Sequence, residues 1–233
     1  MHFQFQFQSV FAESSFILQG VLLTIYLSAG AILFGSIVAI LLTAVRSNGP
    51  RWAGWAVDAY VELVRNTPFL VQLFIIFFGL PSIGMRLTAN EAALLAMTLN
   101  LAAYSTEIIR AGVEAIHPSQ IEAGLSLAMT RRQIFQHVVI IPAIAKVWPA
   151  LSSQFVLMLL ASSICSFISV QELSGVTAII EQRTFRSFET YIVATILYLI
   201  LALALKVALL GLGRLIFPQV SGLSRVQVKG EAA

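Results

Sequence analysis

Few side chains in this 233-residue sequence could do chemistry, because 58% of it is hydrophobic and only 11% is charged. The three histidines, His2, His117 and His137, lie in no G-x-S-x-G or H-E-x-x-H pattern that would supply a nucleophile with its base, or a zinc site. The sequence has no G-x-x-x-x-G-K-[ST] phosphate-binding loop. Its single cysteine, Cys165, can form neither an intrachain disulfide nor a metal cluster. These absences disfavour an enzyme, predict no metal site, and direct attention to polar groups inside apolar stretches.

Two acid–base pairs lie within apolar stretches of the sequence. Glu62 precedes Arg65 by three residues, and Glu107 precedes Arg110 by three. On a helix, each pair shares one face. Ionisable residues inside a membrane are expensive unless they are paired or face water. The sequence leaves two interpretations open for these four charges: a static ionic clamp between two helices, or a network that gates a pathway.

A second group of polar residues lies near the middle of the apolar stretches. Thr67 and Pro68 interrupt one stretch, and the backbone groups freed there must find a partner or line a cavity. Transporters place their binding sites at this depth. The expected pathway for a bound molecule consists of Thr67, Gln72, Asn100, Tyr104, Ser162 and Ser163. For each of these residues, the alternative is a hydrogen bond between helices.

The elements that must position these residues are membrane-spanning helices. A soluble domain is roughly a quarter charged, and this sequence has too few polar residues to cover a soluble fold. A spanning helix needs about 20 mainly apolar residues. The sequence therefore predicts an all-α integral membrane protein with about five spans. They are expected over residues 16–45, 55–80, 91–116, 138–170 and 191–217, with an elbow at Pro142 and Pro149.

The basic residues predict how the chain is oriented. Three groups of them fall after the first, third and fifth spans: Arg46 and Arg51; Arg131, Arg132 and Lys146; and Arg214, Arg225 and Lys229. An odd number of spans places these groups on one side, so the positive-inside rule predicts an outer N-terminus and a cytoplasmic C-terminus. We expect an outer or interfacial segment over residues 1–15, a membrane domain over 16–217 and a cytoplasmic tail over 218–233. The net charge of +3 reflects this bias and does not indicate nucleic-acid binding.

One polar segment, HPSQIEAGLSLAMTRRQIFQHVVIIP over residues 117–142, separates the third and fourth spans. Ser119 and Glu122 fit the S-x-x-E capping box, and a second box begins at Thr130. These boxes predict a short helix over about 119–128 and a second helix that leads into the fourth span. The short helix needs something to pack against. Its apolar stripe consists of Ile121, Leu125 and Ala128. A membrane-surface connector and a docking helix both fit this pattern.

This segment resembles the EAA loop of ATP-binding-cassette importer permeases. That pattern is Glu-Ala-Ala, three residues, Gly, nine residues and an Ile-x-Leu-Pro ending. Here Gly124 replaces the second Ala of the pattern, Ala128 replaces its Gly, and Pro142 falls one residue late.

Two further stretches resemble the second and third spans of the polar amino acid permeases, the group that includes histidine, glutamine and arginine permeases. They are YVELVRNTPFLVQLFIIFFGLP over residues 60–81 and MTLNLAAYSTEIIRAGVEAI over residues 97–116. The likeness extends in register over about residues 16–217.

The resemblance implies a type I importer of the bacterial inner membrane. Two such subunits, identical or homologous, would form the pathway for a small polar amino acid within the lipid bilayer. Two cytoplasmic ATPase subunits would bind ATP and Mg, so this chain would hold no cofactor and would not itself be an enzyme. A periplasmic or lipoprotein substrate-binding protein would deliver the substrate. The loop over about 117–137 would couple to the ATPase through Ser119, Glu122, Ala123, Gly124 and Leu125.

Several alternatives stay open at this point. Many relatives carry a lysine and an acidic or amide residue where this chain has Leu160 and Ala161, so a charge-selective role for that site is unsupported. Neither the amino acid nor the choice between a homodimer and a heterodimer follows from the sequence. The main alternative function is an ATP-independent secondary transporter or a channel subunit.

Overall fold

The computed structural model describes residues 6–218, which are almost entirely helical and contain no β-strand. The α-helices are α1 (Gln8–Phe11), α2 (Ser14–Asn48), α3 (Arg51–Arg65), α4 (Phe69–Phe74), α5 (Ala89–Glu114), α6 (Pro118–Ser126), α7 (Arg131–Gln133), α8 (Ile140–Ala161), α9 (Leu173–Thr184) and α10 (Ser187–Ile216). Two π-helical segments, Ile75–Gly79 and Ile134–Val139, and two 3₁₀ segments, Leu80–Ile83 and Ser162–Ile168, extend or join them. Of the expected tail over 218–233, only Pro218 lies within the described residues.

The expectation of about five spans is confirmed. Four helical stretches are long and apolar enough to cross a membrane: Ser14–Asn48, Ala89–Glu114, Arg131–Ile168 and Ser187–Ile216. A fifth crossing requires α3 and the segment Phe69–Ile83 to act together, and these two are bent by 108° relative to each other. The second expected span is therefore a bent pair and not a straight helix.

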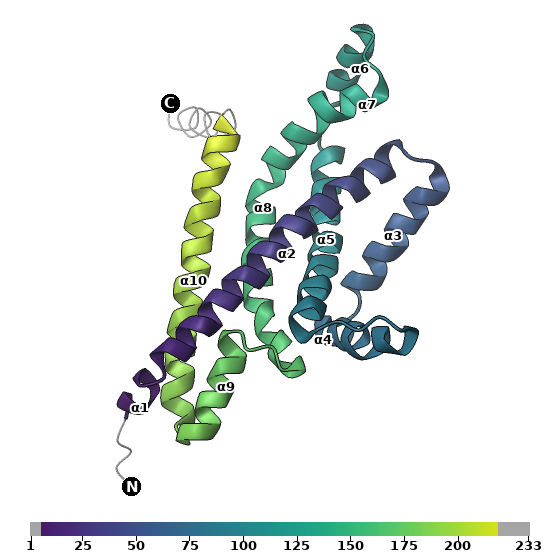
Figure 1. The fold of residues 1–233 in the computed structure, drawn as a ribbon. Helices are drawn as coiled ribbons and strands as arrows, with labels where there is room; N and C mark the ends of the chain where they lie inside the picture. The colour runs from purple at the N-terminus through teal and green to yellow at the C-terminus, as the bar shows by residue number, and fades with distance from the viewer. Residues whose placement is uncertain (1–5, 219–233) are drawn as a thin grey trace, which may run out of the picture.

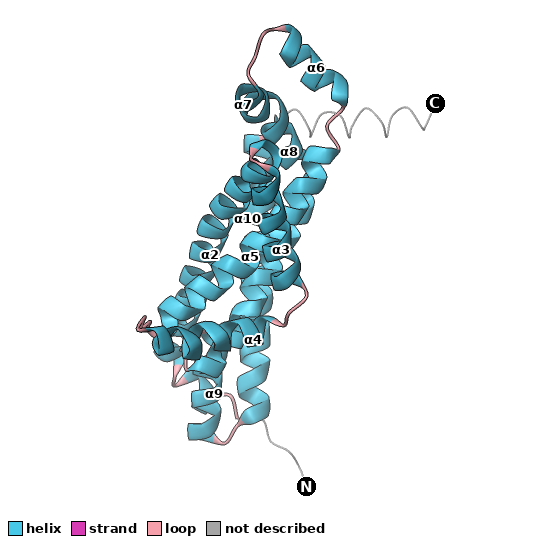
Figure 2. Ribbon diagram, turned by 90° about the vertical axis from the view of Figure 1, so that its right-hand side faces the viewer, coloured by secondary structure: helices cyan, strands magenta, loops and turns pink. Residues whose placement is uncertain are grey.

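The helices form an elongated bundle with two distinct ends (Figure 1). The α6 end carries α6, α7 and the C-terminal end of α10, while the opposite, α9 end carries α1 and α9. The described chain thus starts at one end of the bundle and finishes at the other, as an odd number of crossings requires. Helix α4 lies across the bundle in both views (Figure 2).

Small residues allow α2 to pack closely against α5. Ala31, Gly35 and Ala39 recur every fourth residue on the buried face of α2. A Cβ added at Gly35 would lie 3.1 Å from the side chain of Leu101 on α5. Close approach of backbones over small residues is how helices associate in a bilayer, where apolar side chains gain little by leaving lipid.

The expected elbow at Pro142 and Pro149 does not interrupt the helix, which continues through both prolines from Arg131 to Ile168. Pro142 has no N–H to offer the carbonyl four residues earlier. The wider π-helical turns of Ile134–Val139 end just before Pro142, where the hydrogen-bond ladder would otherwise fail. The lost hydrogen bond is accommodated by a change of helical pitch.

Candidate functional site

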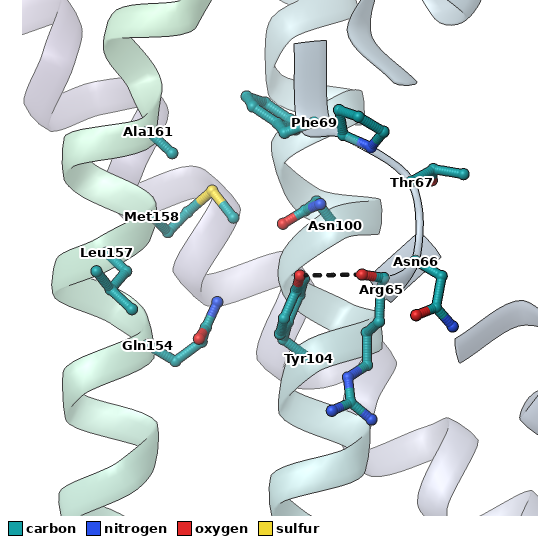
Figure 3. A pocket seen from close by; sticks show the side chains of 11 residues that line it. Arg65, Asn66, Thr67, Phe69, Asn100, Tyr104, Gln154, Leu157, Met158 and Ala161 are labelled. Carbon is teal, nitrogen blue, oxygen red and sulfur yellow. Dashed lines mark hydrogen bonds between the residues drawn. The ribbon is translucent and has the colours of Figure 1, made fainter. Parts of the chain in front are cut away.

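A cavity of about 640 Å³ opens where the chain breaks between α3 and α4. Three elements line it: the break with Arg65, Asn66, Thr67, Pro68 and Phe69; α5 with Asn100 and Tyr104; and α8 with Gln154, Leu157, Met158 and Ala161. Figure 3 shows the side chains of Asn100, Gln154 and Met158 pointing into the space between α5 and α8, whereas those of Asn66 and Thr67 point away from it. Asn100, Tyr104 and Gln154 present amide and hydroxyl groups, whereas Leu157, Met158 and Ala161 form an apolar wall.

The break has a clear physical cause in Pro68. Proline cannot donate a backbone hydrogen bond, which leaves carbonyls at the end of α3 without their helical partners. The Gln72 amide donates to the carbonyl of Val64 at 2.7 Å and to that of Thr67 at 3.0 Å. The Thr67 hydroxyl donates to the carbonyl of Leu63 at 2.8 Å. The side chains of Gln72 and Thr67 therefore stabilise the bend.

Gln72 also fixes a neighbour, since its oxygen accepts from the Asn100 amide at 3.0 Å. Gln72 itself does not line the cavity, whereas Asn100 does. Gln72 thus holds the bend and orients Asn100, and a direct part in the pathway stays a prediction.

The two predicted serines lie apart from this cavity. Ser162 is buried and donates to the carbonyl of Leu159 at 2.7 Å. Ser163 lines a separate hollow of about 570 Å³ beside the 3₁₀ segment and α9. Of the six predicted pathway residues, the cavity brings together Thr67, Asn100 and Tyr104.

The sequence predicted that the fourth span contributes through Ser162 and Ser163, and it missed the four residues of α8 that line the cavity. Gln154, Leu157, Met158 and Ala161 follow one another at spacings of three, one and three, which places them on one helix face. The signal that could have found this wall is Gln154, a polar residue within an apolar span.

An ionic chain runs from the cavity towards the α6 end. Arg65 lies 3.7 Å from Glu107, and Arg110 makes two hydrogen bonds to the same Glu107 carboxylate. Arg110 continues to Glu114 at 2.5 Å. Glu114 lies 3.9 Å from Arg46, which pairs with Asp58 at 2.5 Å. We call these six residues the ionic chain: Arg65, Glu107, Arg110, Glu114, Arg46 and Asp58.

Glu62 was expected to belong with these charges, and the structure places it elsewhere. Its carboxylate accepts from the Asn66 side chain at 2.8 Å, and no ion pair to it occurs within residues 6–218. Arg65 turns away from Glu62 to Glu107 on α5 and stacks its guanidinium 5.8 Å from the centre of the Tyr104 ring. Of the predicted pair Glu62 and Arg65, only Arg65 therefore forms an ion pair between α3 and α5.

The expected short helix is present as α6, but its cap differs from the prediction. His117 is the N-cap, because its ring Nδ1 accepts from the backbone N–H of Ser119 at 3.2 Å. Pro118 occupies the first helical position, where its missing N–H is harmless. The capping box predicted for Ser119 and Glu122 is therefore wrong, since Ser119 already lies inside the helix.

The second predicted capping box is confirmed. The Thr130 side chain accepts from the backbone N–H of Gln133, and the Gln133 side chain accepts from the backbone N–H of Thr130 at 2.8 Å. Between the two helices, Ala128 takes a left-handed conformation with φ of 57°. A glycine would adopt this conformation more easily, and it is the position where the EAA pattern has one.

The predicted coupling residues divide between two faces of α6. Gly124 is buried, and a Cβ added there would lie 2.9 Å from the side chain of Ile134. Glu122, Ala123 and Leu125 are exposed. The predicted packing stripe is thus largely uncovered, and α6 rests on the helix leading to α8 through Gly124.

A buried carboxyl at the α9 end was not predicted at all. Glu172 is fully buried and accepts from the Tyr198 hydroxyl at 2.5 Å and from the backbone N–H of Gly175 at 2.8 Å. The Thr24 hydroxyl lies 3.5 Å away and also accepts from the backbone N–H of Leu173. Burial raises the pKa of Glu172, although hydrogen bonds from Tyr198 and from backbone N–H groups oppose the shift. This carboxyl joins α2, α9 and α10.

Comparison with known proteins places this geometry in a family. Residues 31–221 match the family described as binding-protein-dependent transport system inner membrane component. A putative glutamine transport system permease protein GlnP of Rickettsia bellii is 32% identical, over 82% of this chain and 88% of that protein. The octopine transport system permease protein OccM of Rhizobium meliloti is 33% identical, over 83% of each chain.

Solved structures support the same placement. The crystal structure of an amino acid ABC transporter with histidines superposes with a TM-score of 0.82 at 32% identity, over 91% of this chain and 99% of that one. An inward-facing MetNI methionine ABC transporter shares the fold, with a TM-score of 0.76 at 17% identity, over 88% of this chain and 98% of that one. The chain therefore belongs to the family of binding-protein-dependent transport system inner membrane components.

Proposed function

We propose that this chain is the permease subunit of an ATP-driven importer for polar amino acids or related small molecules. The observation that carries the proposal is the cavity at the break between α3 and α4. It combines one cation, Arg65, with the amides of Asn100 and Gln154 and the hydroxyl of Tyr104. A polar amino acid carries a carboxylate that such a cation attracts, and hydrogen-bonding groups that suit the neutral donors and acceptors.

Coupling through α6 follows from how the elements are joined. Glu122, Ala123 and Leu125 face outward, where a soluble ATPase can contact them, while Gly124 presses on Ile134. Ile134 lies within the helical stretch Arg131–Ile168, which continues without interruption through α8. Helix α8 supplies one wall of the cavity. A push on α6 would therefore reach the cavity through one continuous helical stretch.

The same proposal covers the partners and the placement in the membrane. ATP and Mg would bind to two separate ATPase subunits, a second permease subunit would complete the pathway, and a binding protein would deliver the substrate. The α6 end would face the bacterial cytoplasm, with the N-terminus outside. The positive-inside rule favours this orientation, because Arg46, Arg131, Arg132 and Arg214 all belong to helix ends at the α6 end.

Uptake by proteoliposomes distinguishes this proposal from its alternative. The chain would be co-purified with its ATPase, reconstituted, and supplied with labelled polar amino acids in the presence and absence of ATP. We expect uptake only with ATP. Uptake of equal rate without ATP would indicate a secondary transporter or a channel.

A matched pair of variants tests the cavity. Gln154→Leu removes a polar group that faces the cavity, and we expect uptake to fall about tenfold, the loss of one buried hydrogen bond of about 1.4 kcal/mol. Gln182→Leu changes the same residue type beside the other hollow and should leave uptake within twofold. Equal effects of the two variants would remove the cavity from the pathway.

A further inference from the structure

A groove of about 810 Å³ lies at the α6 end, between the last turns of α2 and the start of the helix that leads into α8. One wall is apolar and includes Ile40, Leu41, Val45 and Ile140. The rim carries Arg131 and Arg132. This groove is separate from the cavity. It adjoins a smaller hollow of about 370 Å³ that is lined by Ile121 and Leu125 of α6 and shares Arg131 and Phe135 with the groove.

The apolar wall continues a lipid-facing stripe. Leu33, Ile37, Leu41 and Val45 recur every fourth residue along α2, and each is between 42% and 59% exposed. An exposed apolar stripe on a spanning helix is suited to contact with acyl chains. A groove that continues this stripe would open to the bilayer at the level where the span ends.

The charged rim lacks a counter-ion. Arg131 and Arg132 are exposed, and within residues 6–218 neither forms an ion pair. None of the residues lining the groove is an aspartate or a glutamate. Arg46, on the neighbouring turn of α2, shows the contrast, because it is paired with Asp58. Two unpaired cations above an apolar groove at a membrane surface are complementary to an anionic lipid headgroup.

We propose that this groove binds one anionic phospholipid, with the phosphate between Arg131 and Arg132 and an acyl chain along Leu41 and Val45. The lipid would bridge α2 and the helix leading into α8, next to α6. Neither the pathway nor the coupling role requires this site, so the proposal stands apart from both.

The test uses the whole transporter complex, purified in mild detergent and examined by native mass spectrometry with phosphatidylglycerol, phosphatidylcholine or glycerol phosphate. We expect retention of phosphatidylglycerol and little of the zwitterionic lipid. The double substitution Arg131→Ala and Arg132→Ala should weaken retention about 25-fold, from about fivefold for each cation near an anionic headgroup. Arg131→Lys with Arg132→Lys should keep most of it.

Two further variants test whether the groove itself, and not positive charge in general, retains the lipid. Val45→Trp fills the apolar wall at an exposed position and should weaken lipid retention with both arginines present. Arg214→Ala removes an exposed cation at the end of α10, outside the groove, and should leave lipid retention unchanged.

Several results would overturn the proposal. One is equal lipid retention by the double arginine variant and the wild type. Another is competition by glycerol phosphate as strong as that by the lipid, which would indicate a free-anion site. A third is loss of the ATPase or of the second permease copy from the double variant with lipid retention unchanged, which would assign the arginines to a protein partner.

Discussion

The two ends of the bundle use ionisable groups in opposite ways. At the α9 end, Glu172 is fully buried and is held by Tyr198 and Gly175. Towards the α6 end, the ionic chain keeps between 28% and 57% of each side chain exposed. A buried group that loses one partner is left with an uncompensated desolvation cost, whereas exposed ion pairs exchange partners with little cost.

The α6 end of the molecule is therefore expected to move more easily than the α9 end. The α9 end is braced by one fixed junction between three helices. The ionic chain offers alternatives, because Glu107 already serves both Arg65 and Arg110, and Glu114 serves both Arg110 and Arg46. We therefore interpret the ionic chain as a set of exchangeable contacts next to the cavity and the Glu172 junction as the fixed point.

The largest expected effect is on stability and comes from removing the buried carboxyl of Glu172. Glu172→Ala would leave the Tyr198 hydroxyl and the Gly175 N–H buried without a partner, at roughly 1–3 kcal/mol each. We expect the free energy of unfolding to fall by about 3 kcal/mol, measured by denaturant titration in detergent. Glu172→Gln keeps an accepting oxygen and should cost about 1 kcal/mol. Equal stability of the alanine variant and the wild type would contradict the brace.

The next largest expected effect is on transport and concerns Glu107 in the ionic chain. Glu107→Gln removes the negative charge that Arg65 and Arg110 share and keeps one accepting oxygen. We expect uptake to fall about tenfold while stability changes by less than about 1 kcal/mol. Glu62→Gln is the matched control, since Glu62 contacts only Asn66 among the polar side chains of residues 6–218. It should keep uptake within twofold. A large loss of stability in Glu107→Gln with little change in uptake would favour the static clamp.

A smaller effect is expected at the caps of the α6 end. Thr130→Ala removes a confirmed capping box and should destabilise the start of the helix leading to α8 by about 1 kcal/mol. Ser119→Ala removes an exposed hydroxyl that lies 2.7 Å from Nδ1 of His117, but it leaves the capping nitrogen in place and should cost only a few tenths of a kcal/mol. Hydrogen exchange of the amides following each residue measures both. A larger effect at Ser119 would restore the capping box that the structure replaces with His117.

The smallest expected effect is a pH dependence of folding stability that arises from Glu172. Because the pKa of Glu172 is raised, the folded chain holds this proton more firmly than the unfolded chain does. Stability therefore falls as pH rises from the unfolded pKa, about 4.3, through the higher folded pKa, and is constant above it. Unfolding midpoints between pH 4.5 and 8 should show this fall in the wild type and not in Glu172→Gln. Parallel profiles for the two proteins would contradict it.

The sequence predicted the large elements well because each depends on local composition. Apolar length located the spans, and the T-x-x-Q pattern at Thr130 located a helix start, since both signals lie within a few residues of what they determine. The prediction at Ser119 was wrong because the backbone N–H of Ser119 donates to the ring nitrogen of His117, two residues earlier, and not to the carboxylate of Glu122.

The site was predicted less completely because it depends on contacts between distant segments. Thr67, Asn100 and Tyr104 were found by depth alone, and depth cannot tell which face of a helix meets the cavity. Gln72 shares that depth but satisfies carbonyls at the bend. Glu172 was missed because it lies outside the expected spans, and its partners Thr24 and Tyr198 are far away in the chain.

The most direct test of the central claim is ATP-driven uptake by the reconstituted complex carrying Glu122→Lys. Gln120→Lys is the control, because it adds a positive charge to the same exposed helix about 200° away around its axis. We predict that Glu122→Lys lowers uptake by at least about tenfold and uncouples it from ATP hydrolysis, an effect of about 1.4 kcal/mol or more, while Gln120→Lys has a smaller effect. Unchanged uptake by an intact Glu122→Lys complex would contradict the claim that α6 couples this permease to its ATPase.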